Sequence, residues 1–318
     1  MTFEALLEPY RAPLRLHCYR MLGSSHDSDD MVQETFARAL RARDTLADPA
    51  AARAWLYRIA TNACLDELDR RPRRERGIGL GPPQDPDEPL AAPRGDDEWL
   101  EPAPSAWMSA VEPGPDARYT QLESVALAFV AALHVLTPPQ RAVLLLRDVV
   151  GLSAAETAAT LDCSVSSANS TLHRARVALE QRVGPRGNGS PAASDVDRAL
   201  LERYLRAWQH GDLDAIIALL HDDVALSMPP RPCWVAGRPD VARFFALRIH
   251  MQVRGALIDA NGRPAAAFYA VKPDGTAHLF ALQLFELDAG RIRTIDHFMT
   301  ASALPAFVAA GVPRTLRA

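Results

Sequence analysis

The chain cannot fold around a single core, because one long segment near its middle carries no pattern of secondary structure. Residues 77–118 are rich in Pro, Gly and acidic residues, and neither helical nor strand periodicity survives in them. Such a composition is typical of a linker. Folded blocks are therefore expected on both sides of it, and 318 residues leave room for about two or three domains.

The linker also holds the acidity of the chain. The net charge is −4, yet residues 77–123 contain 2 Arg and 10 acidic residues. Residues 1–76 contain 13 Arg and 12 acidic residues, and residues 137–186 contain 6 Arg and 4 acidic residues. The neighbouring blocks are thus mildly basic, and an acidic linker could lie along them. Trp99 and Trp107 are unusual in a passive tether.

The first block, residues 1–76, has the pattern of a helical domain. Three aspartates between residues 27 and 30 stand where negative charge stabilises a helix N-terminus. Apolar residues then recur at positions 32, 36 and 40, on one face of a helix. A second helix is predicted from about Ala50 to Arg70, with Pro72 at its end and with these residues facing inward: Leu56, Ile59, Ala60 and Ala63.

The stretch 137–182 predicts three helices with clear start signals. Thr137-Pro138-Pro139-Gln140 and Ser153-Ala154-Ala155-Glu156 are capping boxes, in which two side chains satisfy N–H groups at a helix start. Ser164 offers a third cap. The short turn Leu161–Cys163 makes the last two helices a helix-turn-helix. The apolar stripe expected on the last helix is Val165, Ala168, Leu172, Ala175 and Leu179.

A helix-turn-helix presents its last helix to the major groove of DNA. Short polar and cationic side chains opposite the apolar stripe can hydrogen-bond to base edges and phosphates. A merely solvated polar face is the alternative, but the capping boxes and the tight turn favour DNA contact. The candidate DNA-contacting residues are Ser166, Ser167, Asn169, Ser170, His173 and Arg174.

Two stretches carry a family resemblance. LTPPQRAVLLLRDVVGLSAAETAATLDCSVSSANSTLHRARVAL resembles region four of the sigma-70 family, which recognises the −35 promoter element. DSDDMVQETFARAL followed by RAWLYRIATNACLDELDRR resembles region two, which docks on RNA polymerase and recognises and melts the −10 element. The order and the small size resemble sigma factors of the extracytoplasmic-function type. The expected function is promoter-specific initiation by core polymerase.

The resemblance implies roles for particular positions. Asp30, Gln33 and Glu34 would dock on the clamp coiled coil of the largest polymerase subunit, and region four would bind the flap of the second-largest subunit. On the following helix Arg58, Asn62 and Asp66 form one outward stripe at i, i+4 and i+8.

That stripe, Arg70 and the loop at about residues 43–49 would engage the separated −10 strand, since extruded bases need polar partners and phosphates need cations. For the acidic docking residues the alternative is a solvated helix face, and arginines at a helix C-terminus also occur for dipole reasons alone. One departure is that Asn169 and Thr171 stand where many relatives have basic residues, which weakens phosphate binding and leaves the −35 sequence open.

The last block changes character. Helices are expected over residues 195–210, 212–220 and 239–247, with a strand at Val224–Met228. Alternating segments at about 264–272, 276–287 and 290–300 are separated by turn residues and predict an antiparallel meander. GDLDAIIALLHDDVAL and the final RIRTIDHFM resemble the SnoaL-like, ketosteroid-isomerase-like family, a curved sheet closed by helices around an apolar pocket. A subgroup of sigma factors carries such an extension, and the linker's WLEP resembles a motif of one branch of it.

The resemblance raises the question of catalysis. Asp296, His297, His278 and Tyr269 lie on strand-like segments, and relatives use a pocket Asp or His as a general base. Alternation places Asp296 and His297 on opposite faces of a strand, so both cannot line one pocket. We expect a non-enzymatic domain that regulates the sigma regions in cis. Whether its pocket binds a small ligand is left open. The alternatives are an isomerase- or hydrolase-type enzyme tethered to a DNA-binding module, or a plain helix-turn-helix repressor.

The expected fold is therefore multidomain, with two all-α sigma domains and a C-terminal α+β SnoaL-like cone. The expected domains are residues 1–76 for region two, 77–121 for the linker, 122–184 for region four, 185–194 for a tether and 195–318 for the SnoaL-like domain. Four scattered cysteines predict neither a metal site nor a disulfide scaffold, so no cofactor is expected. No stretch approaches the roughly 20 apolar residues of a membrane span, which predicts a cytoplasmic protein without a membrane partner.

Overall fold

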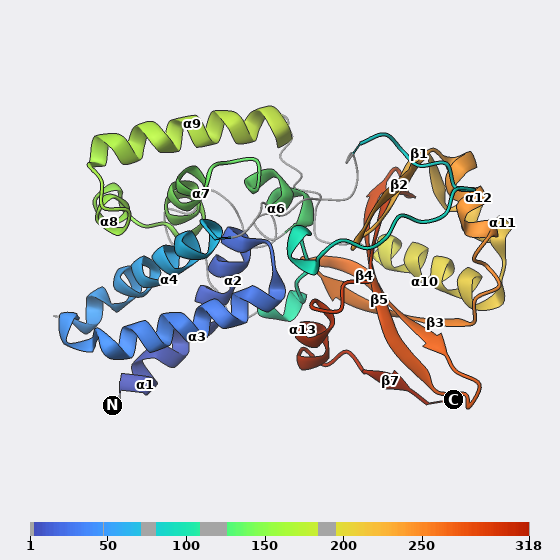
Figure 1. Cartoon of the computed structure of the whole chain (residues 1–318), viewed down its shortest axis with the longest axis horizontal. Helices are drawn as coiled ribbons and strands as arrows, with labels where there is room; N and C mark the ends of the chain where they lie inside the picture. The colour runs from blue at the N-terminus through green and yellow to red at the C-terminus, as the bar shows by residue number, and fades with distance from the viewer. Residues whose placement is uncertain (1–2, 47, 71–80, 109–125, 184–194, 318) are drawn as a thin grey trace. The chain divides into compact units, whose positions relative to one another are not determined.

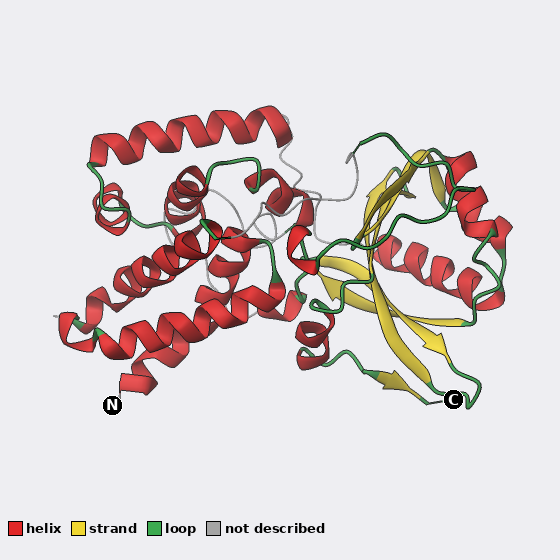
Figure 2. Cartoon of the chain, viewed as in Figure 1, coloured by secondary structure: helices red, strands yellow, loops and turns green. Residues whose placement is uncertain are grey.

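The computed structural model describes residues 3–46, 48–70, 81–108, 126–183 and 195–317 (Figures 1 and 2). The chain divides into two compact units. A helical unit is formed by the described parts of residues 1–74 and 105–189, and a C-terminal unit by those of residues 75–104 and 190–318. Expectations for the tether at 185–194 and for linker residues 77–80 and 109–121 fall outside the described residues.

The first part of the helical unit is helical, as expected. Its helices are α1 (Phe3–Leu7), α2 (Arg11–Leu22), α3 (Ser25–Arg41) and α4 (Ala52–Leu68), of which α3 and α4 correspond to the two helices that the sequence pattern predicts. Short 3₁₀ turns lie at Glu8–Tyr10, Arg43–Thr45 and Pro49–Ala51. The Ser24 hydroxyl caps α3 by accepting from the Asp27 N–H at 3.1 Å. On the apolar face of α3, Val32 is buried, whereas Leu40 in the last turn is 40% exposed.

The second part contains the predicted helix-turn-helix. A 3₁₀ turn at Ser105–Trp107 precedes α6 (Leu127–Leu133), α7 (Pro138–Leu144), a π-helical turn at Leu145–Val150, α8 (Ala154–Thr160) and α9 (Val165–Val183). Both capping boxes are present: the Thr137 N–H donates to Gln140 Oε1 at 3.1 Å, and the Glu156 N–H donates to the Ser153 hydroxyl at 3.2 Å. These side chains fix where α7 and α8 begin.

The two parts of the helical unit share one hydrophobic core. Leu14 and Leu56 of the first part and Leu133, Leu145 and Leu172 of the second part belong to the same buried cluster. Polar contacts add to it, because the buried Arg141 guanidinium donates to the carbonyl oxygen of Met21 as well as to that of Leu133. The helical unit is therefore one packed body.

The C-terminal unit combines helices with one sheet. Its helices are α10 (Asp195–His210), α11 (Leu213–Ala218), α12 (Arg238–Ala246) and α13 (Leu304–Ala309). Its strands are β1 (Leu220–Met228), β2 (Arg231–Ala236), β3 (Val253–Ala260), β4 (Arg263–Val271), β5 (Ala277–Asp288), β6 (Arg291–Phe298) and β7 (Thr315–Leu316). The α+β expectation is confirmed, although the sequence pattern missed β2, β3 and β7.

The sheet has the strand order β2-β1-β6-β5-β4-β3, and β7 pairs with the start of β5. β1 and β6 run parallel, whereas the other neighbouring strands are antiparallel. The helices α10 and α12 pack on this sheet, and their aromatic side chains, among them Tyr204, Trp208 and Phe245, form a core with Phe268 and Phe285 of the strands. This core is the second hydrophobic cluster of the chain.

Part of the expected linker is packed against the C-terminal unit. We call residues 81–104 the strap (teal in Figure 1). The Gln84 N–H donates to the Trp234 carbonyl oxygen at 2.8 Å, and the Arg94 N–H donates to that of Pro230 at 2.9 Å. The strap thus runs along β2 and the turn before it, although its sequence shows no strand pattern.

The end of the strap is fixed more firmly. Ala103 and Asn261 exchange two hydrogen bonds, from the Ala103 N–H to Asn261 Oδ1 at 2.9 Å and from the Asn261 N–H to the Ala103 carbonyl oxygen at 2.8 Å. Ser302 donates to Glu101 at 2.5 Å. Two acidic residues that could have lain along a DNA-binding face, Asp85 and Asp87, instead pair with Arg243 of α12. The linker is therefore not a free tether over residues 81–104.

Candidate functional site

The outer face of α9 carries all six candidate DNA-contacting residues of the second part. The helix begins where the Ser164 hydroxyl accepts from the Ser167 N–H at 3.1 Å. Ala168, Leu172, Ala175 and Leu179 are buried at helical spacing. The opposite face is exposed and presents Ser166, Ser167, Asn169, Ser170, His173 and Arg174. Val165 was wrongly placed in the buried stripe: it is 43% exposed, because it lies one turn before the first residue that reaches the core.

The two arginines in the middle of α9 have different surroundings. Arg174 is exposed, and its Nη2 donates to the Thr171 hydroxyl at 3.1 Å. Arg176 instead donates twice to the buried carboxylate of Asp148, at 2.9 and 2.5 Å. Between Ser166 and Arg174 the fixed positive charge belongs to Arg174. The face can thus offer base edges several short hydrogen-bonding groups and phosphates one guanidinium.

The turn before α9 is tight. Asp162 has a φ of 48°, in the left-handed region that Asp tolerates better than most residues. The Cys163 N–H returns to the Ala158 carbonyl oxygen at 3.0 Å. This turn sets the angle at which α9 leaves α8 and so exposes the polar face.

The stripe predicted on α4 is exposed as a whole. Arg58, Asn62 and Asp66 face solvent, whereas the residues between them, among them Ala60 and Cys64, are buried. Arg70 follows at the end of the helix, with its Nη1 3.6 Å from the Glu67 carboxylate. The structure therefore exposes all four candidate residues for the −10 strand.

The loop before α4 is held by side chains of its own. The Asp48 carboxylate accepts from the Ala50 N–H at 2.8 Å, and the Trp55 indole donates to the Thr45 hydroxyl at 3.2 Å. Arg43 and Asp44 remain exposed beside it. The loop is thus shaped locally and presents charged side chains next to the α4 stripe.

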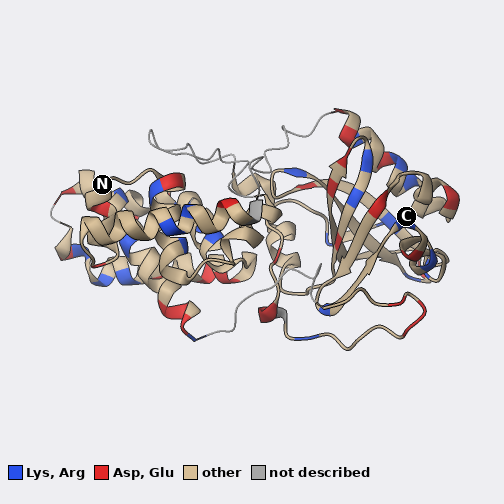
Figure 3. Cartoon of the chain, turned by 90° about the horizontal axis from the view of Figure 1, so that it is seen from above, with Lys and Arg blue, Asp and Glu red and all other residues tan. Residues whose placement is uncertain are grey.

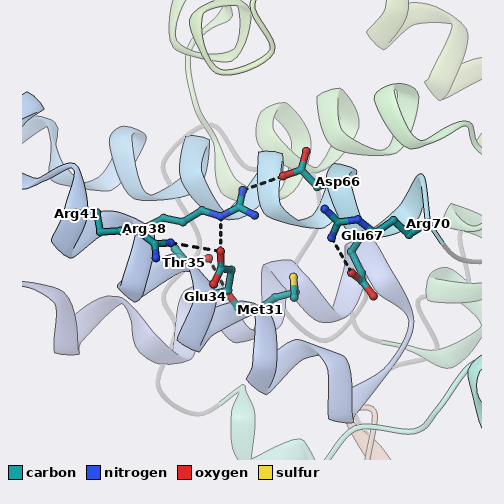
Figure 4. Close-up of polar contacts among 8 residues, drawn as sticks. All are labelled: Met31, Glu34, Thr35, Arg38, Arg41, Asp66, Glu67 and Arg70. Carbon is teal, nitrogen blue, oxygen red and sulfur yellow. Dashed lines mark hydrogen bonds and ion pairs between the residues drawn. The ribbon is translucent and has the colours of Figure 1, made fainter.

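The three candidate docking residues lie on α3. Asp30 and Gln33 are exposed and Glu34 is half-buried. Arg38 donates from Nε to Glu34 at 2.7 Å and from Nη1 to Asp66 of α4 at 2.9 Å, as Figure 4 shows. The hydrogen bond from Arg38 to Glu34 lowers the pKa of the Glu34 carboxyl. Arg38 therefore ties the candidate docking face to the candidate −10 face.

Sequence reasoning missed Arg38. The i, i+4 spacing of Glu34 and Arg38 is a signal that predicts their pairing on a helix. No local signal predicts the contact to Asp66, which lies 28 residues further along the chain. Lys and Arg residues are interspersed with Asp and Glu residues along the helices of the helical unit (Figure 3).

The C-terminal unit contains a cavity of about 250 Å³ between α10, α12 and the sheet. Of the four residues considered for catalysis, His297 lines it. Burial, with a smaller contribution from Arg248, lowers the pKa of His297 to about 4. Asp296 lies on the other face of β6, where it accepts from the Ser227 hydroxyl at 2.6 Å. The opposite orientation predicted for these two neighbours is confirmed.

The other two catalytic candidates lie away from the cavity. His278 contacts the Thr276 hydroxyl at 3.3 Å, and Tyr269 is buried with no hydrogen-bond partner for its hydroxyl among the described residues. Neither lines the cavity. Two arginines that do line it, Arg231 and Arg248, carried no local sequence signal.

Among the residues that the structure describes, no three His, Cys, Asp or Glu side chains come together as a metal site would require. The cysteines Cys18, Cys64, Cys163 and Cys233 are free thiols. None of the described helices combines the length and the apolar character needed to cross a membrane.

Comparison with known families gives three matches along the chain. Residues 6–74 match Sigma-70 region 2, residues 126–179 match Sigma-70, region 4, and residues 201–295 match the SnoaL-like domain. Their order is the one that the sequence patterns predict.

Similar proteins match from about two thirds to nearly all of the chain. ECF RNA polymerase sigma factor SigG of Mycobacterium tuberculosis (strain H37Rv) is 40% identical over 99% of this chain and 85% of its own length. Probable ECF RNA polymerase sigma factor SigI of the same strain is 31% identical over 70% of this chain and 68% of its own length. The crystal structure of the M. tuberculosis extracytoplasmic function sigma factor SigJ has the same fold, with a TM-score of 0.61 and 22% identity over 96% of this chain and 97% of that one.

Proposed function

The chain belongs to the ECF RNA polymerase sigma factors, and from this premise we propose that it directs core polymerase to promoters through two exposed polar helix faces. It binds core RNA polymerase and gives it promoter specificity. The observation that carries the proposal is the outer face of α9, on which six hydrogen-bonding side chains stand free of the core. The protein makes no covalent change to DNA in this role.

Region four is proposed to read the −35 element with α9. Serines 166, 167 and 170, together with Asn169, suit base edges and phosphates, and Arg174 suits either a guanine or a phosphate. With one guanidinium on this stretch, the salt dependence of binding should be shallow for a DNA-binding helix. Region four is also proposed to bind the flap of the second-largest polymerase subunit.

Region two is proposed to hold the polymerase and the −10 strand on adjacent helices. Asp30, Gln33 and Glu34 of α3 would bind the clamp coiled coil of the largest subunit. Three residues of α4 would meet the unpaired strand together with Arg70 just beyond its end: Arg58, Asn62 and Asp66. The amide and carboxylate suit base edges, and the arginines suit phosphates. Their common exposure supports this assignment.

The C-terminal domain is proposed to regulate the sigma regions in cis. The support comes from the strap, which lies in the sequence between region two and region four. Its backbone and side chains form hydrogen bonds with the C-terminal domain. Whatever loosens or tightens the strap changes how much chain is free between those regions. A small ligand in the cavity is part of this proposal.

Run-off transcription with core polymerase tests the promoter function. We expect a promoter-specific product from the promoter of its own gene, which depends on the added chain. Absence of such a product from every candidate promoter, or failure to bind core polymerase, would overturn the proposal.

A chain ending at Gly189 tests the regulation in cis. It retains both sigma regions and removes the strap's partners on the C-terminal domain. We expect the yield of promoter-specific transcript to change at least threefold. An unaltered yield would leave the domain without this role.

The alternative of a tethered isomerase or hydrolase has less support. A general base should titrate near the working pH, and a histidine with a pKa of about 4 is a weak base. Asp296, the other candidate base, is hydrogen-bonded to Ser227 and does not line the cavity. Turnover of a small substrate by the full chain, lost in His297→Gln, would revive this alternative.

A further inference from the structure

The cavity of the C-terminal domain is lined mainly by apolar side chains. Its walls include Trp208, Met228, Phe244, Phe245, Phe268 and Phe280. A volume of about 250 Å³ lies just below the usual range of small-molecule sites. Such walls favour the apolar body of a small ligand over water.

Two arginines line the same cavity without an acidic neighbour. Arg248 donates to the Phe244 carbonyl oxygen at 2.9 Å, and its guanidinium carbon lies 3.6 Å from the centre of the Phe244 ring. Arg231 donates to the Ala91 carbonyl oxygen at 2.6 Å. Among the described residues that line the cavity there is no Asp or Glu, and no ion pair is found for either arginine.

The missing counter-charge has a chemical consequence. A guanidinium has five N–H donors, and these two have each given one to a backbone carbonyl. Burial without an acidic partner lowers the pKa of Arg248 from its ordinary value. Both arginines are only partly buried. A partly desolvated cation is still stabilised when an anion pairs with it, and a carboxylate matches the fork of a guanidinium.

Two neutral polar residues, Gln283 and His297, also line the cavity and belong to a hydrogen-bonded chain that starts at Tyr204. The Tyr204 hydroxyl donates to Gln283 Oε1 at 3.1 Å, and Gln283 Nε2 contacts His297 Nδ1 at 2.8 Å. Because the amide nitrogen can only donate, His297 accepts at Nδ1 and carries its proton on Nε2. His297 is therefore a neutral donor, with Nε2–H available to an oxygen in the cavity.

The strap contributes one wall. Leu90 lines the cavity, and the next residue, Ala91, accepts the hydrogen bond from Arg231. The same arginine thus lines the cavity and holds the strap. A ligand that contacts Arg231 and Leu90 would tie the strap to the domain.

We propose that this cavity binds a small monocarboxylic acid with an apolar body, its carboxylate paired with Arg248 and Arg231 and its body covered by Leu90 of the strap. This rests on the proposed regulation in cis, for which it names the ligand class and the point of contact. Binding holds residues 81–104 on the C-terminal domain, and release of the acid loosens them.

Calorimetric titration of the full-length chain tests the ligand class. The probes are 4-phenylbutanoate and octanoate, each compared with its uncharged amide. We expect the acids to bind at least tenfold more tightly than the amides, because hydrogen bonds to charged groups exceed neutral ones. Equal affinity of acid and amide, or no binding of either acid, overturns the proposal.

Variants of the cavity locate the binding. Arg248→Gln should lose at least tenfold in affinity for the acids and lose the preference over the amides, and Arg248→Lys should recover part of it. Arg206→Gln is the matched control, since Arg206 is exposed on α10 and bonds to its own helix. Thermal unfolding checks that each variant is folded. Unchanged affinity in folded Arg248→Gln overturns the site.

Hydrogen exchange at the Gln84 and Arg94 amides tests the strap. Both donate to the C-terminal domain, so both should exchange at least threefold more slowly with 4-phenylbutanoate bound. Unchanged exchange with the acid bound overturns the coupling to the strap. Run-off transcription without any acid reports on the proposed function separately: a chain that transcribes but binds no acid refutes only the present inference.

Discussion

The Arg38 guanidinium on α3 donates to the Asp66 carboxylate on α4 at 2.9 Å (Figure 4). Through its Nε the same side chain also holds Glu34, so a change at Glu34 disturbs both the proposed docking face and the proposed −10 face. Asp30 has no such link, since its one ion pair among the described residues is to His26 of the same helix, at 3.9 Å. Asp30 is therefore the cleaner probe of polymerase docking.

Asp30→Ala should weaken binding to core polymerase about fivefold, which corresponds to about 1 kcal/mol for an exposed charge pair. Glu34→Ala should weaken it similarly and also reduce promoter opening, because Arg38 is released. Fluorescence anisotropy with labelled protein measures the affinity for core polymerase. Glu202→Ala, an exposed helical acid of the C-terminal domain, should bind as the unaltered chain does; an equal loss there would point to general charge effects.

Two arginines of α9 should separate DNA binding from stability. Arg174→Ala should weaken binding to the −35 element by about 1–2 kcal/mol and leave the free energy of unfolding nearly unchanged. Arg176→Ala should lower the free energy of unfolding by about 2 kcal/mol, since it leaves the buried Asp148 carboxylate without its two hydrogen bonds. Denaturant unfolding measures the free energy of unfolding, and promoter binding at several salt concentrations measures the affinity for the −35 element. The reverse pattern would place Arg174 in a structural role.

Asn261 should control the end of the strap. Asn261→Gly removes the acceptor of the Ala103 N–H and tolerates the φ of 51° at this position. We expect exchange of the Ala103 amide to accelerate about tenfold, because one buried hydrogen bond is worth about 1–3 kcal/mol when its partner is lost. Asn261→Asp keeps an acceptor for the Ala103 N–H and should accelerate exchange less than Asn261→Gly does. Similar exchange in both variants would mean that other contacts fix the strap.

Asp296 should act in folding and not in ligand binding. Asp296→Ala leaves the buried Ser227 hydroxyl without its acceptor and should cost about 1–3 kcal/mol of unfolding free energy. Affinity for 4-phenylbutanoate should stay within twofold, because Asp296 does not line the cavity. A selective loss of binding with unchanged stability would contradict this assignment.

His17 should make the helical unit sensitive to acid. It is buried between α2 and α4, where Nε2 bonds to the Thr61 hydroxyl at 2.9 Å, and burial lowers its pKa from 6.5 to about 3. The unfolded chain takes up this proton below about pH 6.5 and the folded chain only near pH 3. The stabilisation is thus complete above pH 6.5 and lost as the pH falls, by about 2 kcal/mol at pH 5.

The measurement is the free energy of unfolding at pH 7.5 and pH 5 for the unaltered chain and for His17→Gln. The glutamine variant should lose about 2 kcal/mol less over this interval, since it does not titrate. Carboxylates titrate in both proteins and cancel in the difference. Parallel pH profiles would show that His17 is not kept neutral by the fold.

Local signals determined much of the helical unit. The capping boxes at Thr137 and Ser153 and the spacing of Ala168, Leu172 and Ala175 depend on residues three or four apart, so they could be found in the sequence. Alternation along β6 likewise put Asp296 and His297 on opposite faces. Which of them reaches the cavity was decided by the side of the sheet that α10 and α12 cover.

Other features depend on partners that are distant in sequence. β3 was missed because Gly255 interrupts its pattern, yet any Cβ there would lie 2.5 Å from the Leu205 side chain of α10, so the glycine allows close packing of helix on strand. The strap shows no periodicity because its hydrogen bonds go to β2 and to turns of another part of the chain. Periodicity records which residues face a core, whereas these contacts arise only when the chain has folded.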